Sequence, residues 1–127
     1  MSEIEIIYRN KRESLWKKIL ILILTNIAAI SFMTTGSAKL LGAESAIIMF
    51  EEIGFGQWFR YLTGSIEITG AIVILIPPIA FWGALLLSLT MIGAVLIHLF
   101  VLGSSPSIAL LLLATTLSLM LLKPIRN

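Results

Sequence analysis

Four long apolar runs dominate the sequence and restrict the folds open to it. They cover about residues 19–38, 58–76, 79–102 and 107–122. A helix that crosses the hydrocarbon core of a bilayer needs about 20 apolar residues, within a range of about 17–25. Backbone polar groups in lipid must be bonded within their own segment, and these runs do not alternate apolar and polar residues as barrel strands do. The runs therefore predict transmembrane helices.

Helix-breaking residues separate the runs. Pro77 and Pro78 end the second run and impose a tight connection to the third. Residues 103–106, which read GSSP, separate the third run from the fourth, and the proline suits the first turn of a new helix. The sequence therefore predicts an all-α fold, a transmembrane four-helix bundle.

Residues 44–53, between the first two runs, follow a different pattern. Apolar side chains recur there at helical spacing and glutamates fall elsewhere: Ala46, Ile47, Phe50 and Ile53 against Glu44, Glu51 and Glu52. Gly54 is suited to end such a helix. We expect a short amphipathic helix on the outer surface, serving either as an ordered connector or as a functional lid.

Basic residues flank the apolar region. Five precede the first run and two follow the last: Arg9, Lys11, Arg12, Lys17 and Lys18, then Lys123 and Arg126. Basic flanks mark the cytoplasmic side, so we expect both termini in the cytoplasm and residues 39–57 outside. The expected parts are a basic cytoplasmic segment, 1–18, and a four-helix transmembrane domain, 19–127. The first run exceeds the about 7–15 apolar residues of a signal peptide, which favours an uncleaved span.

The composition excludes several classes of protein. Hydrophobic residues make up 58% of the 127 residues and charged residues only 13%, against about 25% charged in soluble domains. The absence of cysteine excludes disulfides and thiol chemistry carried by this chain. We expect no metal site, because one histidine and one intramembrane carboxylate fall short of about three or four protein ligands. We also expect no catalytic residue and no nucleic-acid partner, since the basic residues serve topology.

One carboxylate, Glu67, lies near the middle of the second run. Polar and small residues around it recur at steps of three and four and form one helical stripe: Arg60, Thr63, Gly64, Glu67, Gly70 and Ala71. Small residues let helices approach closely, so we expect this stripe to face the bundle. Ionisable residues inside spans are rare, usually paired and often functional.

Three further ionisable residues fall in the outer half of the predicted bundle: Lys39, Arg60 and His98. We predict that they converge with Glu67 on a ligand-binding or proton-exchanging site. The expected lining is small and polar and comprises Thr63, Gly64, Gly70 and Gly36. The alternative is a structural role, in which hydrogen bonds satisfy Glu67 and His98 while the two cations reach the headgroups.

Three segments carry a resemblance to a known family: GSAKLLG at 36–42, IGFGQWFRYLTGSIEITGAIVILIP at 53–77 and MIGAVLIHLF at 91–100. Over about residues 20–122 the chain resembles the DoxX-like integral membrane proteins. The family consists of small four-helix membrane proteins with a lysine after the first helix, a glutamate within the second and often a histidine late in the third. Lys39, Glu67 and His98 match these positions. We expect a bacterial inner or plasma membrane protein.

The resemblance implies several functions. Some members look like subunits of a thiosulfate:quinone oxidoreductase, others are associated with thiol or superoxide stress complexes, and animal relatives act as receptor assembly factors. The first hypothesis is a small membrane subunit, not catalytic alone, that binds a quinone or another lipophilic ligand for a redox partner. The second is an assembly or structural factor, and the third a small proton-coupled transporter. The partners considered are the lipid bilayer, a membrane or extracytoplasmic protein, and further copies of the chain.

Overall fold

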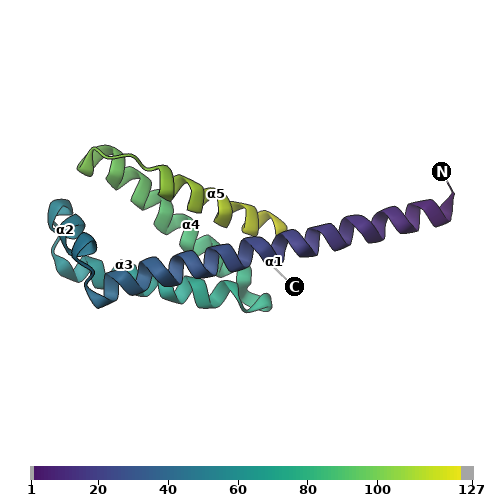
Figure 1. Cartoon of the computed structure of the whole chain (residues 1–127), viewed down its shortest axis with the longest axis horizontal. Coiled ribbons are helices and arrows are strands. Elements are labelled where there is room, and N and C mark those ends of the chain that lie inside the picture. The colour runs from purple at the N-terminus through teal and green to yellow at the C-terminus, as the bar shows by residue number, and fades with distance from the viewer. Residues whose placement is uncertain (1, 124–127) are drawn as a thin grey trace.

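The computed structural model describes residues 2–123, and this part of the chain is helical and contains no strand (Figure 1). The all-α prediction is therefore confirmed. The five α-helices are α1 (Glu3–Leu41), α2 (Glu44–Ile53), α3 (Gln57–Ile74), α4 (Ala80–Ile97) and α5 (Ser107–Leu122). A 3-10 turn, η1 (Pro77–Ile79), precedes α4, and a π-helical turn, η2 (His98–Leu102), follows it. Arg126 and the predicted boundary at residue 127 lie outside the described residues.

Helix α1 continues well beyond the first apolar run. Its N-terminal half projects from the bundle as a solvent-exposed extension, drawn purple in Figure 1. The Ser2 hydroxyl caps the helix by accepting a hydrogen bond from the Glu5 N–H at 3.3 Å. No glycine or proline occurs between Glu3 and Thr35, so nothing breaks the helix where the charge pattern changes at residue 18. Residues 3–18 and the apolar run thus form one continuous helix.

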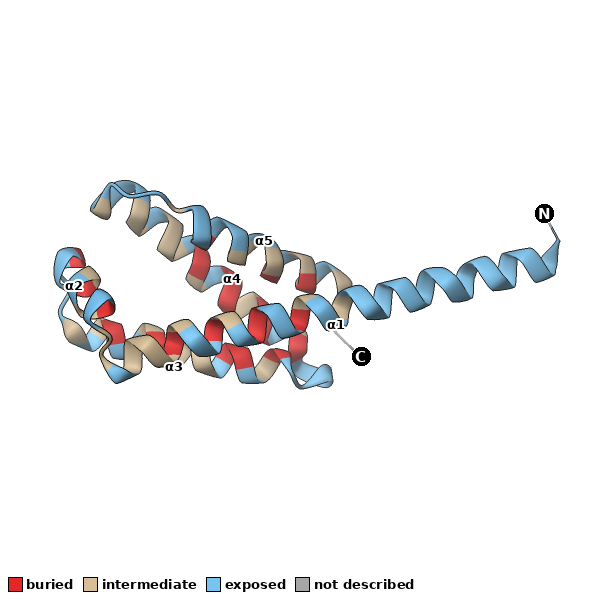
Figure 2. Cartoon of the chain, in the orientation of Figure 1, coloured by how far each residue is buried: buried red, intermediate tan, exposed pale blue. Residues whose placement is uncertain are grey.

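The helices form two antiparallel pairs that pack against each other. Helix α3 returns along α1, α5 returns along α4, and α3 packs on α4. Figure 2 shows buried residues along the inward faces of all four helices and an exposed N-terminal extension. The core contains Ala28, Phe32, Ala71, Ile74, Ala84, Leu87 and Leu119. Small core residues bring the helix axes together, and the larger ones fill the remaining space.

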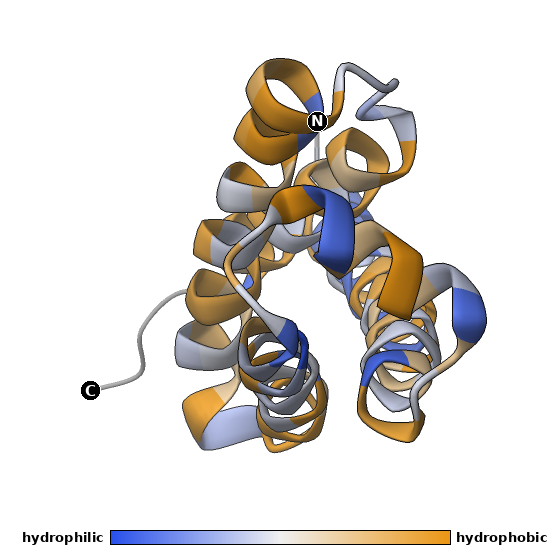
Figure 3. Ribbon diagram, turned by 90° about the vertical axis from the view of Figure 1, so that its left-hand side faces the viewer, coloured by the Kyte–Doolittle hydropathy of each residue, from blue (hydrophilic) through white to orange (hydrophobic). Residues whose placement is uncertain are grey.

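Two of the predicted spans meet the length and apolarity needed to cross a membrane. These are α1 and the continuous Pro77–Leu102 unit of η1, α4 and η2. Helix α3 has 18 residues and carries Arg60 and Glu67 inside it, and α5 has only 16 residues. Large apolar side chains are nevertheless exposed on all four helices, including Ile30, Ile72, Leu89 and Leu111. Figure 3 shows hydrophobic residues over most of the bundle.

Helix α2 and the turn η2 lie at the end of the bundle where α1 stops. Helix α2 has the predicted bounds and amphipathic pattern, with Ala46, Phe50 and Ile53 buried, and it ends at Gly54, where φ is 85°. The third apolar run was predicted as one continuous helix over 79–102, and here the structure differs. Its last turn widens into η2, which Gly103 ends with φ at 64° and an N–H bonded to the His98 carbonyl.

Candidate functional site

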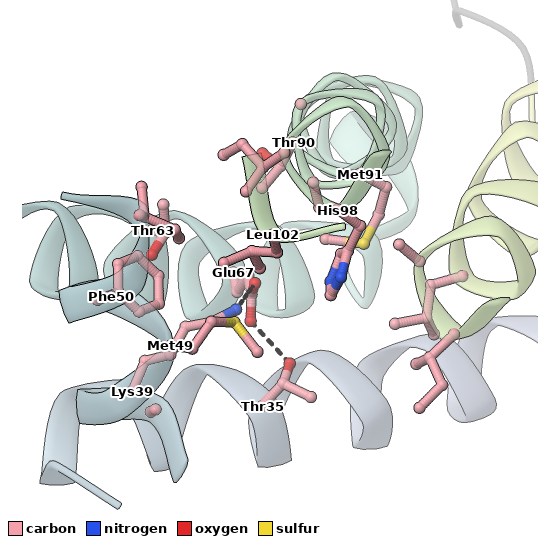
Figure 4. Close-up of a pocket in the computed structure, with 18 of the residues that line it drawn as sticks. Thr35, Lys39, Met49, Phe50, Thr63, Glu67, Thr90, Met91, His98 and Leu102 are labelled. Atoms are coloured by element: carbon pink, nitrogen blue, oxygen red, sulfur yellow. Dashed lines mark hydrogen bonds and ion pairs between the residues drawn. The ribbon is translucent and has the colours of Figure 1, made fainter. Parts of the chain in front are cut away.

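A cavity of about 710 Å³ lies between the two helix pairs at this end of the bundle. All five α-helices and η2 contribute to its lining. Its walls are mainly apolar, with Met49, Phe50, Phe59, Ile66, Met91 and Leu112 among them. Lys39, Glu67 and His98 add ionisable groups (Figure 4). Cavities of about 300–1,000 Å³ with mainly apolar walls and a few polar groups are typical of small-molecule sites.

Glu67 is almost completely buried, at 1% exposure, and both of its carboxylate oxygens are engaged. The Lys39 ammonium forms an ion pair with Oε1. The Thr35 hydroxyl donates a hydrogen bond to Oε2 at 2.7 Å. Both partners come from α1, as Figure 4 shows. Two donors from one helix thus compensate the burial of a carboxylate on another.

The meeting of Lys39 and Glu67 follows from helix geometry. Helices α1 and α3 are antiparallel and cross at Gly36 and Gly64, where a Cβ on either glycine would lie 3.0 Å from the other's carbonyl oxygen. Lys39 and Glu67 each lie three residues beyond one of these glycines. Side chains in a helix lean toward its N-terminus. In an antiparallel pair, Lys39 and Glu67 therefore lean toward each other across the crossing.

Arg60 takes a place different from the predicted one. It was expected beside Glu67, but its guanidinium donates to the Lys39 carbonyl oxygen and, at 2.7 Å, to Oε1 of Gln57. It is 5% exposed and is not among the residues that line the cavity. Helix ends leave carbonyl groups without intrahelical partners, and Lys39 lies in the last turn of α1. Arg60 therefore caps α1 and does not pair with Glu67.

His98 lies across the cavity from Glu67, at the start of η2 (Figure 4). Its Nδ1 is 2.8 Å from the hydroxyl oxygen of Ser104. Within residues 2–123, no hydrogen bond joins His98 to Glu67 or to Arg60. Lys39, Glu67 and His98 thus line one cavity, with His98 on the opposite wall.

The predicted lining residues divide into two groups. Thr63 lines the cavity, whereas Gly36, Gly64 and Gly70 do not. Gly36 and Gly64 form the crossing described above, and a Cβ on Gly70 would lie 2.6 Å from Leu87. These three glycines are needed for close helix packing, and the same close packing leaves no space beside them.

Two polar residues of the site were not predicted. Thr35 lies one turn before Lys39 on the same face of α1, so helical spacing from Lys39 was the signal that could have found it. Gln57 bonds to Arg60 and, through Nε2, to the Ile47 carbonyl of α2 at 3.1 Å. No local pattern predicts a bond between two separate helices.

A family model described as the DoxX-like family matches residues 23–121, which is most of the chain. The chain belongs to the DoxX-like family. Together with two helices able to cross a membrane, this membership indicates a membrane protein. No curated protein and no solved structure matches the chain.

The cavity of this DoxX-like protein has a defined hydrogen-bonding capacity. An ammonium group has three donors, and one of those of Lys39 is used by Glu67. On the opposite wall, Nε2 of His98 has no hydrogen-bond partner within the described chain. Thr63 and Thr90 bond to carbonyl groups of their own helices. The site therefore offers donors of Lys39 at one wall and, at the other, a His98 ring nitrogen that donates or accepts according to its tautomer. With the apolar interior between them, the site suits a lipophilic molecule that carries polar groups.

Proposed function

We propose that this DoxX-like protein is a small membrane subunit whose cavity binds a quinone-like lipophilic ligand for a redox partner. The observation that carries the proposal is the mainly apolar cavity of about 710 Å³ with the Lys39–Glu67 pair in its wall. A quinone has a flat apolar ring with two carbonyl oxygens on opposite sides. Lys39 donates to one carbonyl, and His98, in the tautomer that carries its proton on Nε2, donates to the other.

The proposal places α1, α3, α4 and α5 across a bacterial inner or plasma membrane, with both termini in the cytoplasm. Exposed apolar residues on each helix support this arrangement, because a contiguous apolar surface of such extent marks an interaction with lipid or protein. The two charged residues within α3 are buried in the bundle. The lipid-facing side of α3 instead carries residues such as Leu62 and Ile72.

Electrons for the ligand come from a partner protein, since the chain has no cysteine and, within residues 2–123, no tyrosine or tryptophan lines the cavity. Reduction of a quinone to a quinol consumes two electrons and two protons. Glu67 and His98 lie at the cavity walls, where they can exchange those protons. The chain is therefore a ligand-holding subunit and is not catalytic alone.

One observation favours a second function, that of an assembly or structural factor. Glu67 is neutralised by Lys39 and bonded by Thr35, so the buried carboxylate is satisfied without any ligand. A satisfied buried network fixes the relative positions of helices. In that case the outer surface of the bundle binds partner proteins. Proton-coupled transport, the third hypothesis, stays a prediction from the sequence.

Native mass spectrometry of the protein purified in mild detergent, titrated with a fully substituted short-chain benzoquinone, tests the first function. Wild type should bind one quinone, and Lys39→Met, which keeps the apolar stem, should bind at least about tenfold more weakly, because it loses a charged donor. Thr69→Ala is the control, since the Thr69 hydroxyl is exposed and bonds to its own helix. Equal or absent binding in all three folded proteins would favour the assembly function.

A further inference from the structure

Helix α2 forms one wall of the cavity and has glycines with positive φ angles at both ends. Ser45, Ala46, Met49, Phe50 and Ile53 of this helix line the cavity. Gly42, before α2, and Gly54 and Gly56, after it, adopt positive φ angles of 75°, 85° and 99°. Glycine adopts such angles without steric cost and is the residue type best suited to a change of backbone direction. Movement of α2 at these points would widen access to the buried part of the cavity.

One side chain joins α2 to the rest of the molecule by a hydrogen bond. Within residues 2–123 this is Gln57, whose Nε2 donates to the Ile47 carbonyl at 3.1 Å. Its Oε1 accepts from the buried Arg60, and Arg60 in turn bonds to the Lys39 carbonyl. Gln57 therefore ties the wall helix to the same cluster that fixes the end of α1.

Apolar packing adds to this attachment but is limited. The rings of Phe50 and Phe59 meet edge to face, with centroids 5.7 Å apart. Helix α2 has only ten residues, and its N-cap residue, Ala43, makes no side-chain capping bond. Short helices are marginal alone and depend on tertiary contacts. Local openings of such elements cost far less free energy than global unfolding.

We propose that Gln57 is a positioning residue that holds α2 in place as one wall of the cavity, and that breaking its bond to Ile47 lets α2 move away and opens the buried part of the cavity, around Met91, to a ligand. The opening is a property of the fold, and only the identity of the ligand rests on the proposed function. The bond is single and neutral, so closure is reversible and does not require unfolding of the bundle.

Thiol labelling tests this directly because the chain has no cysteine. A single Met91→Cys substitution places a thiol on the cavity wall at a position 5% exposed. In this background, Gln57→Glu keeps the acceptor for Arg60 but replaces the donor to Ile47 with a carboxylate oxygen. We expect a water-soluble maleimide to label the thiol about three- to tenfold faster than with Gln57 intact, the factor that follows from one lost hydrogen bond. Gln57→Asn, which is shorter, should give an intermediate rate.

Three controls separate opening from general loosening. Ser65→Ala removes an exposed hydroxyl bonded within α3 and should leave the rate unchanged. A thiol at the exposed Ile4 should react at one rate in every variant, and a thiol at the buried Ala29, outside the cavity, should stay protected. An unchanged rate at position 91 in Gln57→Glu would overturn the proposal. So would faster labelling at position 29 as well. No ligand is present, so a failure to bind quinone leaves these results intact.

Discussion

At the scale of single residues, Glu67 shows how this fold accommodates a buried charge. Moving a carboxylate out of water costs several kcal/mol, and a partner with good hydrogen bonds is required to offset that cost. Lys39 supplies the opposite charge and Thr35 a second donor. Because both lie on one face of α1, a single helix contact provides the whole compensation. The carboxylate therefore also fixes how α1 and α3 sit against each other.

Removing the carboxylate should destabilise the bundle. Glu67→Ala leaves the Lys39 ammonium without its partner, and breaking a buried pair costs roughly 3–5 kcal/mol. The loss should be near the lower end, because the Lys39 side chain is 19% exposed and can reach water. Thermal unfolding in detergent measures it. Lys39→Ala added to Glu67→Ala should recover part of the loss, and simple additivity of the two losses would contradict the pairing.

The hydroxyl of Thr35 should contribute separately. Thr35→Val keeps the shape of the side chain but removes the donor to Glu67, and a hydrogen bond to a charged group contributes about 1.5–3 kcal/mol. The neighbouring Thr34→Val is a matched control, since the exposed Thr34 hydroxyl bonds to the Ile30 carbonyl of its own helix. The same unfolding measurement should show a clear loss for position 35 and little change for position 34. Equal effects would mean that the Thr35 bond is unimportant.

At the scale of helices, close packing depends on particular glycines. A Cβ on Gly83 would lie 2.8 Å from the backbone nitrogen of Ile74, an atom that cannot rotate away. A Cβ on Gly93, in the same helix, would have no atom within 4 Å, because Gly93 faces the cavity. One helix thus contains a glycine required by packing and another that is not.

This difference gives a matched pair of substitutions. Gly83→Ala should cost about 1–3 kcal/mol, because it forces α3 and α4 apart. Gly93→Ala should be neutral or stabilise by up to about 1 kcal/mol, since alanine favours the helix and nothing opposes it. Melting temperatures of the two variants in one detergent test the pair. A stable Gly83→Ala protein would show that α3 and α4 are separated more widely than described.

The sequence predicted the helices better than their contacts. Apolar runs and prolines located α3, α4 and α5, and the spacing of Ala46, Phe50 and Ile53 predicted α2 correctly. The division at residue 18 rested on charge, which does not break a helix. The widened turn η2 has no local signal in the sequence.

Contacts between helices were harder to predict for a physical reason. Periodicity tells which residues share a face, but distances across a contact depend on where two helices cross. Arg60 and Glu67 share a face of α3, yet Arg60 bonds to the end of α1 and Glu67 to Lys39 and Thr35. Gly36, Gly64 and Gly70 were expected at the cavity and instead form the crossings.

At the scale of the whole molecule, the proposed arrangement in the membrane has a direct test. Single cysteines at Glu13, Glu51 and Leu75 can be probed in intact cells with a membrane-impermeant maleimide, since all three positions are exposed. Glu51→Cys should be labelled from outside, and Glu13→Cys and Leu75→Cys only after permeabilisation. Ile27→Cys, in the apolar part of α1, should stay unlabelled throughout. Labelling of positions 51 and 75 from the same side would exclude α3 as a span.

The unbroken length of α1 has a mechanical consequence. At about 1.5 Å per residue, its 39 residues extend about 58 Å, nearly twice the thickness of a bilayer core. One end carries Thr35 and Lys39 in the cavity wall, and the other carries the basic extension. No glycine or proline interrupts the helix between the extension and Thr35, so a tilt at one end is transmitted to the other. A protein that binds and tilts the extension would therefore also tilt the cavity wall. The two ends of α1 are coupled in this way through the helix itself.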